Sequence, residues 1–450
     1  MHRNVDRRDF LKTAGTAGLA LAAAPWFSGI ARGGENRKPN ILWILADDLG
    51  YGDLGCYGCK DIPTPNIDAL AASGTRFTQY YATAVCTPTR TCLLTGRYAQ
   101  RFGGVEHALM GAGGLSPQAV TAAELFKSAD YQTGLIGKWH LGYKGDMLPT
   151  RQGFGEFFGH RGGKIDYFKH TDTTQGNGHD LWEGETEVQR EGYATDLFAD
   201  RAVKFLRDHA AQPFFLYLAF NAPHYASIDK DITQQLQAPE EYLKRFVKTG
   251  KDGTKRERYA AMVSCLDDAV GKVVGELKNL GLEDNTLVIF MSDNGGTPQS
   301  GGSNGVLRGN KGGIYEGGIR VPMVARWNGI IPKGTVSDEA AHVVDLLPTA
   351  LAAAGVKPSA ELALDGLDIL PVLQVKARIP ERPLFWRHGN AAVRRGKWKL
   401  IQKSAKDKDA ELFDLETDPG EKKSLDAENP KVVAELQAAL DQWLASLPGK

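Results

Sequence analysis

The sequence predicts an α/β fold whose mostly parallel, mixed sheet is flanked by helices, with a smaller C-terminal α+β domain after it. The first part follows from two observations. Short apolar stretches alternate with stretches of helical period, and the apolar stretches are too hydrophobic to have a solvated face. The second part follows from a change to short strands separated by turns from about residue 359, which predicts an antiparallel sheet.

The elements of the large domain can be placed in order. Apolar runs predict strands at 40–45, 213–220 and 286–292, and further strands are expected at 133–137 and 321–327. Helical period predicts the helices that connect them, at 63–74, 121–129, 196–209 and 258–280. We therefore expect one large domain over residues 38–358.

The C-terminal domain is expected over residues 359–450. Its predicted strands lie at 384–386, 391–393, 398–401 and 411–414. The Asn429–Pro430 dipeptide then begins a last helix, because proline is tolerated in the first helical turn. We expect this helix to end near Leu444.

The N-terminus predicts export from the cytoplasm. Arg7 and Arg8 precede a weakly apolar run at 13–24, the arrangement of a twin-arginine signal, which we place at 1–31. The alternative is an apolar anchor, but the run is short and rich in small residues. A periplasmic or extracellular location, a transient contact with the twin-arginine export machinery and no stable membrane span are therefore expected.

Charge and cysteine content exclude some classes of protein. The 450 residues include 54 Lys and Arg and 54 Asp and Glu, so no basic excess suggests a nucleic-acid partner. Five cysteines are an odd number, so they do not all pair within the chain. Cys56 and Cys59 have CxxC spacing, which favours a local disulfide or two thiols over a zinc site that would need a second pair.

Polar side chains follow four of the predicted strands. Because the carboxyl ends of parallel strands meet at one edge of a sheet, we expect these side chains to form one site. A single polar residue at a strand end is usually a turn former, so the recurrence carries the argument. The residues are Asp47 and Asp48, Lys138 and His140, His224, and Asp293 and Asn294.

Two further segments supply candidate site residues. Cys86 begins a loop that turns into a helix, and Arg90 lies four residues later on the same helical face. A helix N-terminus and a guanidinium would attract an anion there; the alternative is an inert buried cysteine. Lys311 lies in a glycine-rich stretch at 301–313 that does not match a phosphate-binding loop, and either a mobile active-site loop or a plain surface loop fits it.

These residue types favour a hard cation beside an anionic ligand. Asp47, Asp48, Asp293 and Asn294 offer only oxygen atoms, which suit calcium or magnesium better than zinc. Lysine, arginine and histidine next to a divalent metal indicate a ligand of the sulfate or phosphate type.

Together these stretches resemble the type I sulfatase family, of the arylsulfatase and N-acetylgalactosamine-6-sulfatase kind. The stretches that carry the resemblance are 46–53, 86–97, 137–142, 223–224 and 292–295. Thr89 stands where the family most often has serine, and it keeps the hydroxyl. The resemblance implies an alkaline-phosphatase-like fold and a hydrolase that removes sulfate from a sulfated carbohydrate or an aryl sulfate.

The resemblance also implies a role for each residue. A maturation enzyme would convert Cys86 to formylglycine, whose hydrate attacks sulfur with Asp293 as base. One calcium ion would be held by Asp47, Asp48, residue 86, Asp293 and Asn294. Arg90 would stabilise the hydrate, and Lys138 and Lys311 would bind the sulfate oxygens. His224 would protonate the leaving alcohol, helped by Lys311, and His140 would accept the proton whose loss expels sulfate.

Two other functions stay open from the sequence. A phosphodiesterase or phosphonate monoester hydrolase of the same superfamily could use a similar site. A binder of sulfated glycans with an unmodified cysteine would not need two histidines and a nucleophile. Contacts to the leaving group are expected in the loops at 106–114, 159–184 and 383–390, with His107, His179, His388 and Arg387 as candidates. The sequence does not name the sugar.

Overall fold

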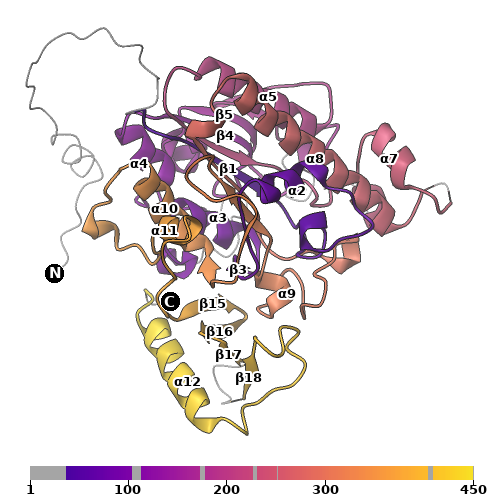
Figure 1. Cartoon of the computed structure of the whole chain (residues 1–450). Coiled ribbons are helices and arrows are strands. Elements are labelled where there is room, and N and C mark those ends of the chain that lie inside the picture. Colours follow the sequence, from indigo (N-terminus) through magenta and orange to yellow (C-terminus); the bar gives the residue numbers. More distant parts are fainter. Residues whose placement is uncertain are drawn as a thin grey trace, which may run out of the picture.

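The computed structural model describes residues 37–103, 113–172, 178–226, 231–250, 252–403 and 409–448. The predicted export signal at 1–31, the loop at 106–112 and His107 lie outside these residues. A large sheet with helices on both sides forms most of the molecule, and a small sheet lies below it in Figure 1. This arrangement confirms the predicted fold class.

The large sheet has ten strands in the order β13-β2-β12-β11-β1-β10-β4-β5-β8-β9. Its centre is parallel and consists of β11 (Thr286–Ser292), β1 (Asn40–Ala46), β10 (Phe214–Ala219), β4 (Gln132–Lys138) and β5 (Glu156–His160). Antiparallel pairs at both sides make the sheet mixed. The outer strands are β12 (Met323–Arg326), β2 (Thr75–Phe77), β13 (Thr335–Ser337), β8 (Trp182–Glu183) and β9 (Thr186–Glu187).

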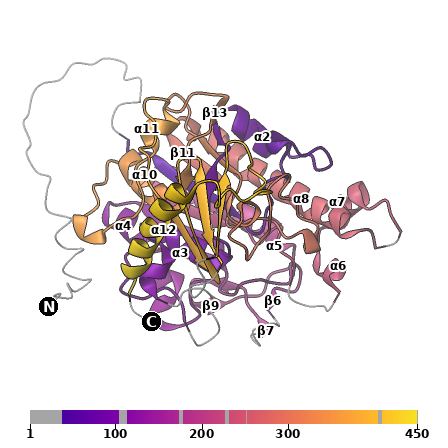
Figure 2. The ribbon, with the colours of Figure 1, turned by 90° about the horizontal axis from the view of Figure 1, so that it is seen from below.

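Both faces of the central strands are buried, which explains the long apolar runs of β1, β10 and β11. In β1, Ile41, Trp43 and Leu45 face one hydrophobic cluster, and Leu42 and Ile44 face the other. The first cluster includes side chains of α3 (Cys86–Thr95), α4 (Ala122–Ser128) and α10 (Leu346–Ala353). The second includes those of α2 (Pro65–Ala72), α5 (Ala194–Asp208) and α8 (Lys255–Asn279). Figure 2 shows these two groups of helices on opposite sides of the sheet.

The small sheet is antiparallel, as predicted, and contains β15 (Leu384–His388), β16 (Asn390–Arg395), β17 (Trp398–Gln402) and β18 (Ala410–Asp414). The helix α12 (Pro430–Ala445) packs against it through Leu436, Leu440 and Trp443. These residues belong to the same hydrophobic cluster as one face of the large sheet, so the two sheets share a core. The boundary between residues 358 and 359 stays a prediction.

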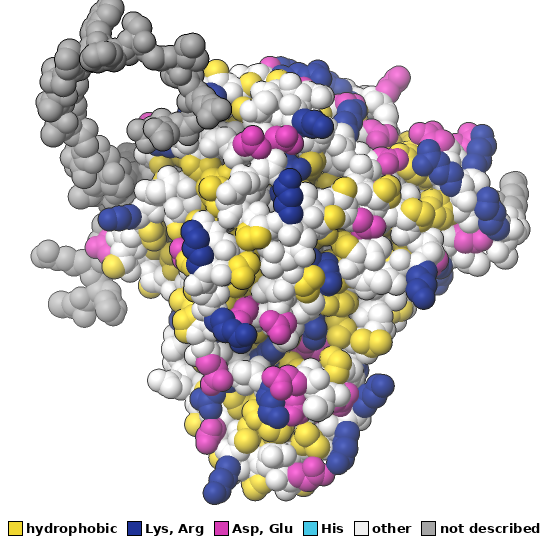
Figure 3. Space-filling model, viewed as in Figure 1, with side chains coloured by type: hydrophobic (Ala, Val, Ile, Leu, Met, Phe, Trp, Pro, Cys, Tyr) yellow, Lys and Arg dark blue, Asp and Glu magenta, His cyan; other side chains and the backbone are white. Residues whose placement is uncertain are grey.

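The remaining elements are short. They are β3 (Tyr80–Tyr81), β6 (Thr171–Asp172), β7 (Gly178–His179), β14 (Ala341–His342), α6 (Ile232–Gln235), α7 (Glu240–Phe246), α9 (Glu316–Ile319) and α11 (Leu370–Leu373). In the described ranges, no helix is both long and apolar enough to cross a bilayer. Positive and negative side chains are interspersed on the face shown in Figure 3, and no basic patch stands out there.

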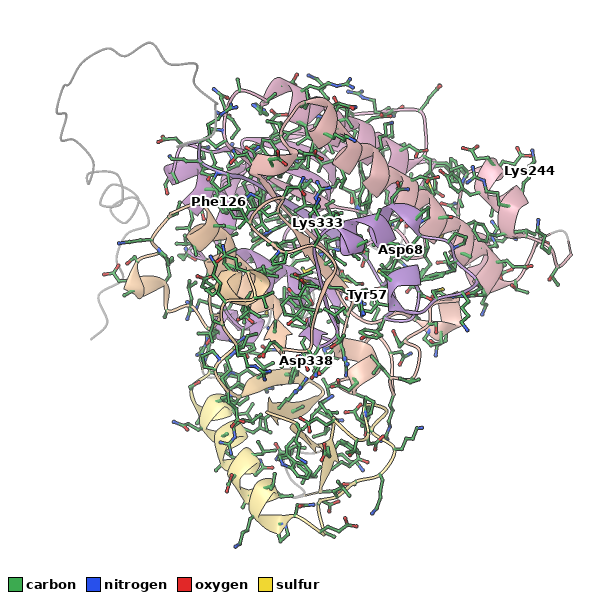
Figure 4. The ribbon with its side chains drawn as sticks, viewed as in Figure 1. Tyr57, Asp68, Phe126, Lys244, Lys333 and Asp338 are labelled. Atoms are coloured by element: carbon green, nitrogen blue, oxygen red, sulfur yellow. The ribbon has the colours of Figure 1, made fainter. Side chains whose placement is uncertain are left out.

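All five cysteines are free thiols in this structure, including the CxxC pair. Tyr57 lies between Cys56 and Cys59 in sequence and donates its hydroxyl to the carbonyl of Phe77 at 2.7 Å. Asp68 accepts the backbone N–H of Cys56 at 2.7 Å, and Figure 4 labels both Tyr57 and Asp68. The segment is therefore held by these hydrogen bonds without a disulfide.

Candidate active site

The ends of β1 and β11 place four oxygen-bearing side chains together. These strands are in register, with Ala46 opposite Ser292, so the residues that follow each strand are neighbours. The backbone N–H of Asp48 donates to Oδ1 of Asp293 at 3.1 Å. The side-chain amide of Asn294 donates to Oδ1 of Asp48 at 2.8 Å. Asp47, Asp48, Asp293 and Asn294 are all buried.

Cys86, the first residue of α3, faces this group. Its thiol donates to Oδ1 of Asp47 at 3.3 Å, and the ammonium of Lys311 donates to its sulfur at 3.4 Å. Burial, together with Asp293 and Asp47 nearby, raises the pKa of the Cys86 thiol. An unmodified Cys86 therefore stays protonated here and is a poor nucleophile.

Arg90 is fully buried one turn further along α3. Its Nη2 lies 2.9 Å from Oδ2 of Asp293, and its Nη1 donates to the carbonyl of Lys138 at 3.2 Å and to the hydroxyl of Tyr217 at 3.3 Å. These contacts fix the guanidinium between the strand ends and Cys86. Arg90 is thus held to carboxylate, carbonyl and hydroxyl at once, which a lysine could not reproduce.

Two lysines pair with the two aspartates that end β1. Lys138 Nζ lies 2.5 Å from Oδ2 of Asp47, and Lys311 Nζ lies 2.7 Å from Oδ1 of Asp48. Burial opposes ionisation of Asp48, but Lys311 and His224 outweigh it and lower its pKa. Burial, with Asp47 beside it, raises the pKa of Asp293 to about 6. Cations at this edge therefore outweigh burial at Asp48 but not at Asp293.

Both candidate histidines lie at the same edge and favour the neutral form. His224 Nε2 lies 3.6 Å from Oδ2 of Asp48, and its Nδ1 lies 2.7 Å from the carbonyl oxygen of Tyr225. Burial and Lys311 lower the pKa of His224 to about 3. Burial and Lys138 lower the pKa of His140 well below its usual value. Each ring is thus set to accept a proton or to relay one.

The buried donor atoms at this edge are close enough together to hold a metal ion. Ligand atoms of Asp47, Asp48, Cys86 and His224 all lie within 4.8 Å of one another. The side-chain oxygen of Asn294 is buried and has no hydrogen-bond partner among the described residues. A buried acceptor without a partner is costly, and a bound cation would satisfy it. His224 joins this group although the sequence did not suggest it as a ligand.

Two residues near the site were not singled out from the sequence, His160 and Tyr217, and Thr89 was noted only for its place in the motif. His160 ends β5 opposite Lys138 in the register, and no described residue hydrogen bonds to either of its ring nitrogens. Tyr217 contacts Arg90 from within β10, where only its hydroxyl distinguishes it from the apolar run. Thr89 donates its hydroxyl to the carbonyl of Asp293 at 2.6 Å. The strand β5 was missed because Gly159 and His160 interrupt its apolar pattern.

Two of the loops expected to contact a leaving group are described by the structure, one around β6 and β7 and one at the end of β15. Residues 159–172 and 178–184 run from the end of β5 to just beyond β8, and a Cβ on Gly163 would come within 2.7 Å of Nε2 of His140. His179 pairs with Glu187 at 3.3 Å. Arg387 and His388 end β15, and the Arg387 carbonyl accepts from Gln100 at 3.0 Å.

The geometry agrees with comparisons to known proteins. A family model described as Sulfatase matches residues 39–356, and one described as N-sulphoglucosamine sulphohydrolase, C-terminal, matches residues 309–448. Arylsulfatase A of Homo sapiens is 36% identical over 468 residues, which cover 90% of this chain and 85% of that protein. Arylsulfatase J of Mus musculus is 35% identical over 387 residues, and the match spans 82% of this chain but only 62% of that protein's length.

One solved structure extends the likeness to three dimensions. It is described as the crystal structure of Ps i-CgsB in complex with k-i-k-neocarrahexaose. It has a TM-score of 0.82 and 35% sequence identity to this chain, and the match covers 90% of this chain and 93% of that one.

Proposed function

The chain belongs to the sulfatase family, whose members are enzymes that hydrolyse sulfate esters, and we propose that it removes sulfate from a sulfated sugar through a formylglycine made from Cys86. The alkaline-phosphatase-like fold implied by the sequence is confirmed by the structural match. One observation carries the proposal. Cys86 lies at the carboxyl ends of the central strands. Its sulfur is 3.3 Å from Oδ1 of Asp47 and 3.4 Å from Nζ of Lys311.

The metal of this site would be one calcium ion. Asp47, Asp48, Asp293, Asn294 and residue 86 would hold it, and the unpartnered oxygen of Asn294 supports this assignment. The ion would supply positive charge to the sulfate group. Oxygen ligands favour calcium or magnesium, and both can be tested by metal replacement.

The modified residue would replace a protonated thiol with a reactive group. Formylglycine, as its hydrate, supplies a hydroxyl that attacks sulfur and a second hydroxyl whose deprotonation releases sulfate. Asp293 would accept the first proton, because its carboxylate lies close enough to Cys86 to raise the pKa of that thiol. Arg90, held by Asp293 at 2.9 Å, would stabilise the hydrate.

The chain's cations would bind and orient the sulfate. Lys138 is paired with Asp47, and Lys311 is paired with Asp48, so each ammonium is held in place at the site by a different carboxylate. Burial opposes the charge of Lys311, but Asp48 and Cys86 outweigh it and raise its pKa, so it stays cationic. Two fixed cations lower the cost of gathering negative charge on the sulfate oxygens during transfer.

The histidines would move protons on either side of the sulfur. His224 would protonate the leaving alcohol, with help from Lys311. Its pKa of about 3 leaves it neutral at rest, so the negative charge of the bound substrate is needed to raise that pKa before it can donate. His140, also neutral, would accept the second proton.

The proposal includes two transient partners and a location. A formylglycine-generating enzyme would modify Cys86, and the twin-arginine machinery would export the chain to the periplasm or beyond the cell. Arg7 and Arg8 before the apolar run support export.

Mass spectrometry of the peptide that carries residue 86 tests the proposal most directly. Protein from the native host should show the mass of the aldehyde, and a plain thiol would contradict the proposed chemistry. Cys86→Ala should abolish sulfate release from an aryl sulfate and from sulfated sugars. Faster cleavage of matched phosphate diesters than of sulfate monoesters by the unaltered protein would favour a phosphodiesterase instead.

A further inference from the structure

A half-buried cation, Lys164, lies one aromatic ring away from the candidate catalytic pocket. Its Nζ lies 4.6 Å from the centre of the Tyr225 ring. Tyr225 follows His224, and the centres of their two rings are 4.4 Å apart. His224 in turn contacts Asp48. A line of contacts therefore leads from the pocket through His224 and Tyr225 to Lys164.

The ammonium of Lys164 is close enough to Lys311 and Lys138 to be repelled by their charges. Burial lowers its pKa, Asp172 opposes the shift, and Lys311 and Lys138 add to it. No carboxylate in the described part of the chain forms an ion pair with Lys164. An ammonium that is partly removed from water, near two other cations, gains most from an added anion.

The backbone just before Lys164 is held by hydrogen bonds and lies close to His140. The carboxylate of Asp180 accepts the backbone N–H of Arg161 at 3.2 Å and that of Gly162 at 2.8 Å. Asp180 is itself buried. Gly163 lies so close to His140 that a Cβ there would be 2.7 Å from Nε2. These contacts fix the segment, so the position of Lys164 relative to His140 is set before a ligand arrives.

We propose that Lys164 and Tyr225 form a subsite for a second anionic group, a sulfate or a carboxylate, carried by the sugar whose sulfate is removed. The proposal rests on the sulfatase activity and narrows its substrate class to polyanionic sugars. Tyr225 positions the ammonium of Lys164 over its ring, and Lys164 supplies the charge that attracts the second anionic group. The subsite is specificity-determining and takes no part in the bond that breaks.

The test compares two substrates on one sugar skeleton, one monosulfated and one disulfated. For Lys164→Ala, the ratio of kcat/KM on the disulfated sugar to that on the monosulfated sugar should fall about tenfold or more, the equivalent of about 1.4 kcal/mol. Lys164→Arg should keep most of this preference. Lys169→Ala is the matched control, because Lys169 is exposed on the same connection and should leave the ratio unchanged.

Binding provides a second readout that does not need turnover. In a Cys86→Ala background, calorimetry should show that Lys164→Ala weakens the disulfated sugar more than the monosulfated one, and that added salt reduces the difference. An unchanged preference in both experiments would overturn the subsite. If the unaltered enzyme released no sulfate from any substrate while the binding preference still depended on Lys164, the sulfatase proposal would fail and the subsite would stand.

Discussion

The Nζ atom of Lys399 lies 2.9 Å from Oε1 of Glu316, although 83 residues separate them and both side chains are fully buried. Lys399 lies on β17, and Glu316 begins α9 directly after the loop that carries Lys311. The same ammonium lies 2.8 Å from Oε1 of Glu421. A buried ionic cluster therefore ties the C-terminal sheet to a segment of the active site.

Replacing Lys399 should destabilise the protein strongly. Lys399→Met would leave two buried carboxylates without their shared ammonium, and we expect the free energy of unfolding to fall by about 3–5 kcal/mol. Urea denaturation measures the change. Lys403→Met is the control, because Lys403 is exposed and contacts Glu411 at 3.3 Å, a pair worth about 0–1 kcal/mol. Equal losses in the two variants would contradict the role of the cluster.

The same cluster should make stability depend on pH. Burial raises the pKa of Glu421 from 4.5 to about 7, and Glu316 adds to the shift while Lys399 opposes it. The folded protein thus holds this proton more tightly than the unfolded chain. The resulting stability is complete below pH 4.5 and is lost as pH rises to about 7.

Glu421→Gln tests this dependence because an amide has a similar shape and does not titrate. Its melting temperature should decline less than that of the unaltered protein between about pH 5 and about pH 8. Parallel declines would show that another group sets the slope. Glu416→Gln, on the exposed turn after β18, serves as the comparison.

Removing the proposed calcium ion should lower both activity and stability. A chelator would leave the carboxylates of Asp47 and Asp48 close together, relieved only by Lys138 and Lys311. We expect a lower melting temperature that added calcium restores. Asp48→Asn should weaken calcium affinity about tenfold or more. Asp338→Asn is the surface control, because Asp338, labelled in Figure 4, is exposed. A chelator that changes neither quantity would exclude a metal role.

The hydroxyl of Thr89 should matter more than its methyl group. It donates to the carbonyl of Asp293 at 2.6 Å and accepts the backbone N–H of Thr83 at 3.0 Å. Thr89→Val keeps the shape but removes the partner of the Thr83 N–H and of the Asp293 carbonyl. We therefore expect the free energy of unfolding to fall by about 1–3 kcal/mol and kcat/KM on an aryl sulfate to fall as well.

Thr89→Ser should behave like the unaltered protein, since it keeps both hydrogen bonds. The aldehyde content at residue 86 must be measured in each variant, so that poor maturation is separated from poor catalysis. If serine and valine lowered stability equally, packing of the methyl group rather than the hydroxyl would be responsible.

The sequence predicted the helices and strands that have a clear hydrophobic pattern of their own. Strands β1, β10 and β11 are apolar along most of their length because both faces of the sheet are covered, and that pattern is visible without a structure. Helix α8 was expected within a few residues of its ends. The edge strands were harder, because β2, β8 and β9 have only two or three residues and their pairing depends on distant partners.

The sequence by itself determined the α/β class and the order of the strands along the chain, since these follow from periodicity, and it predicted the candidate site residues from motif. Only the tertiary structure decided which charges meet. The pairing of Lys311 with Asp48, of Lys399 with Glu316, and the place of Lys164 over Tyr225 join segments far apart in the chain. Such contacts depend on how whole helices and sheets pack, and no local pattern of residues records that packing.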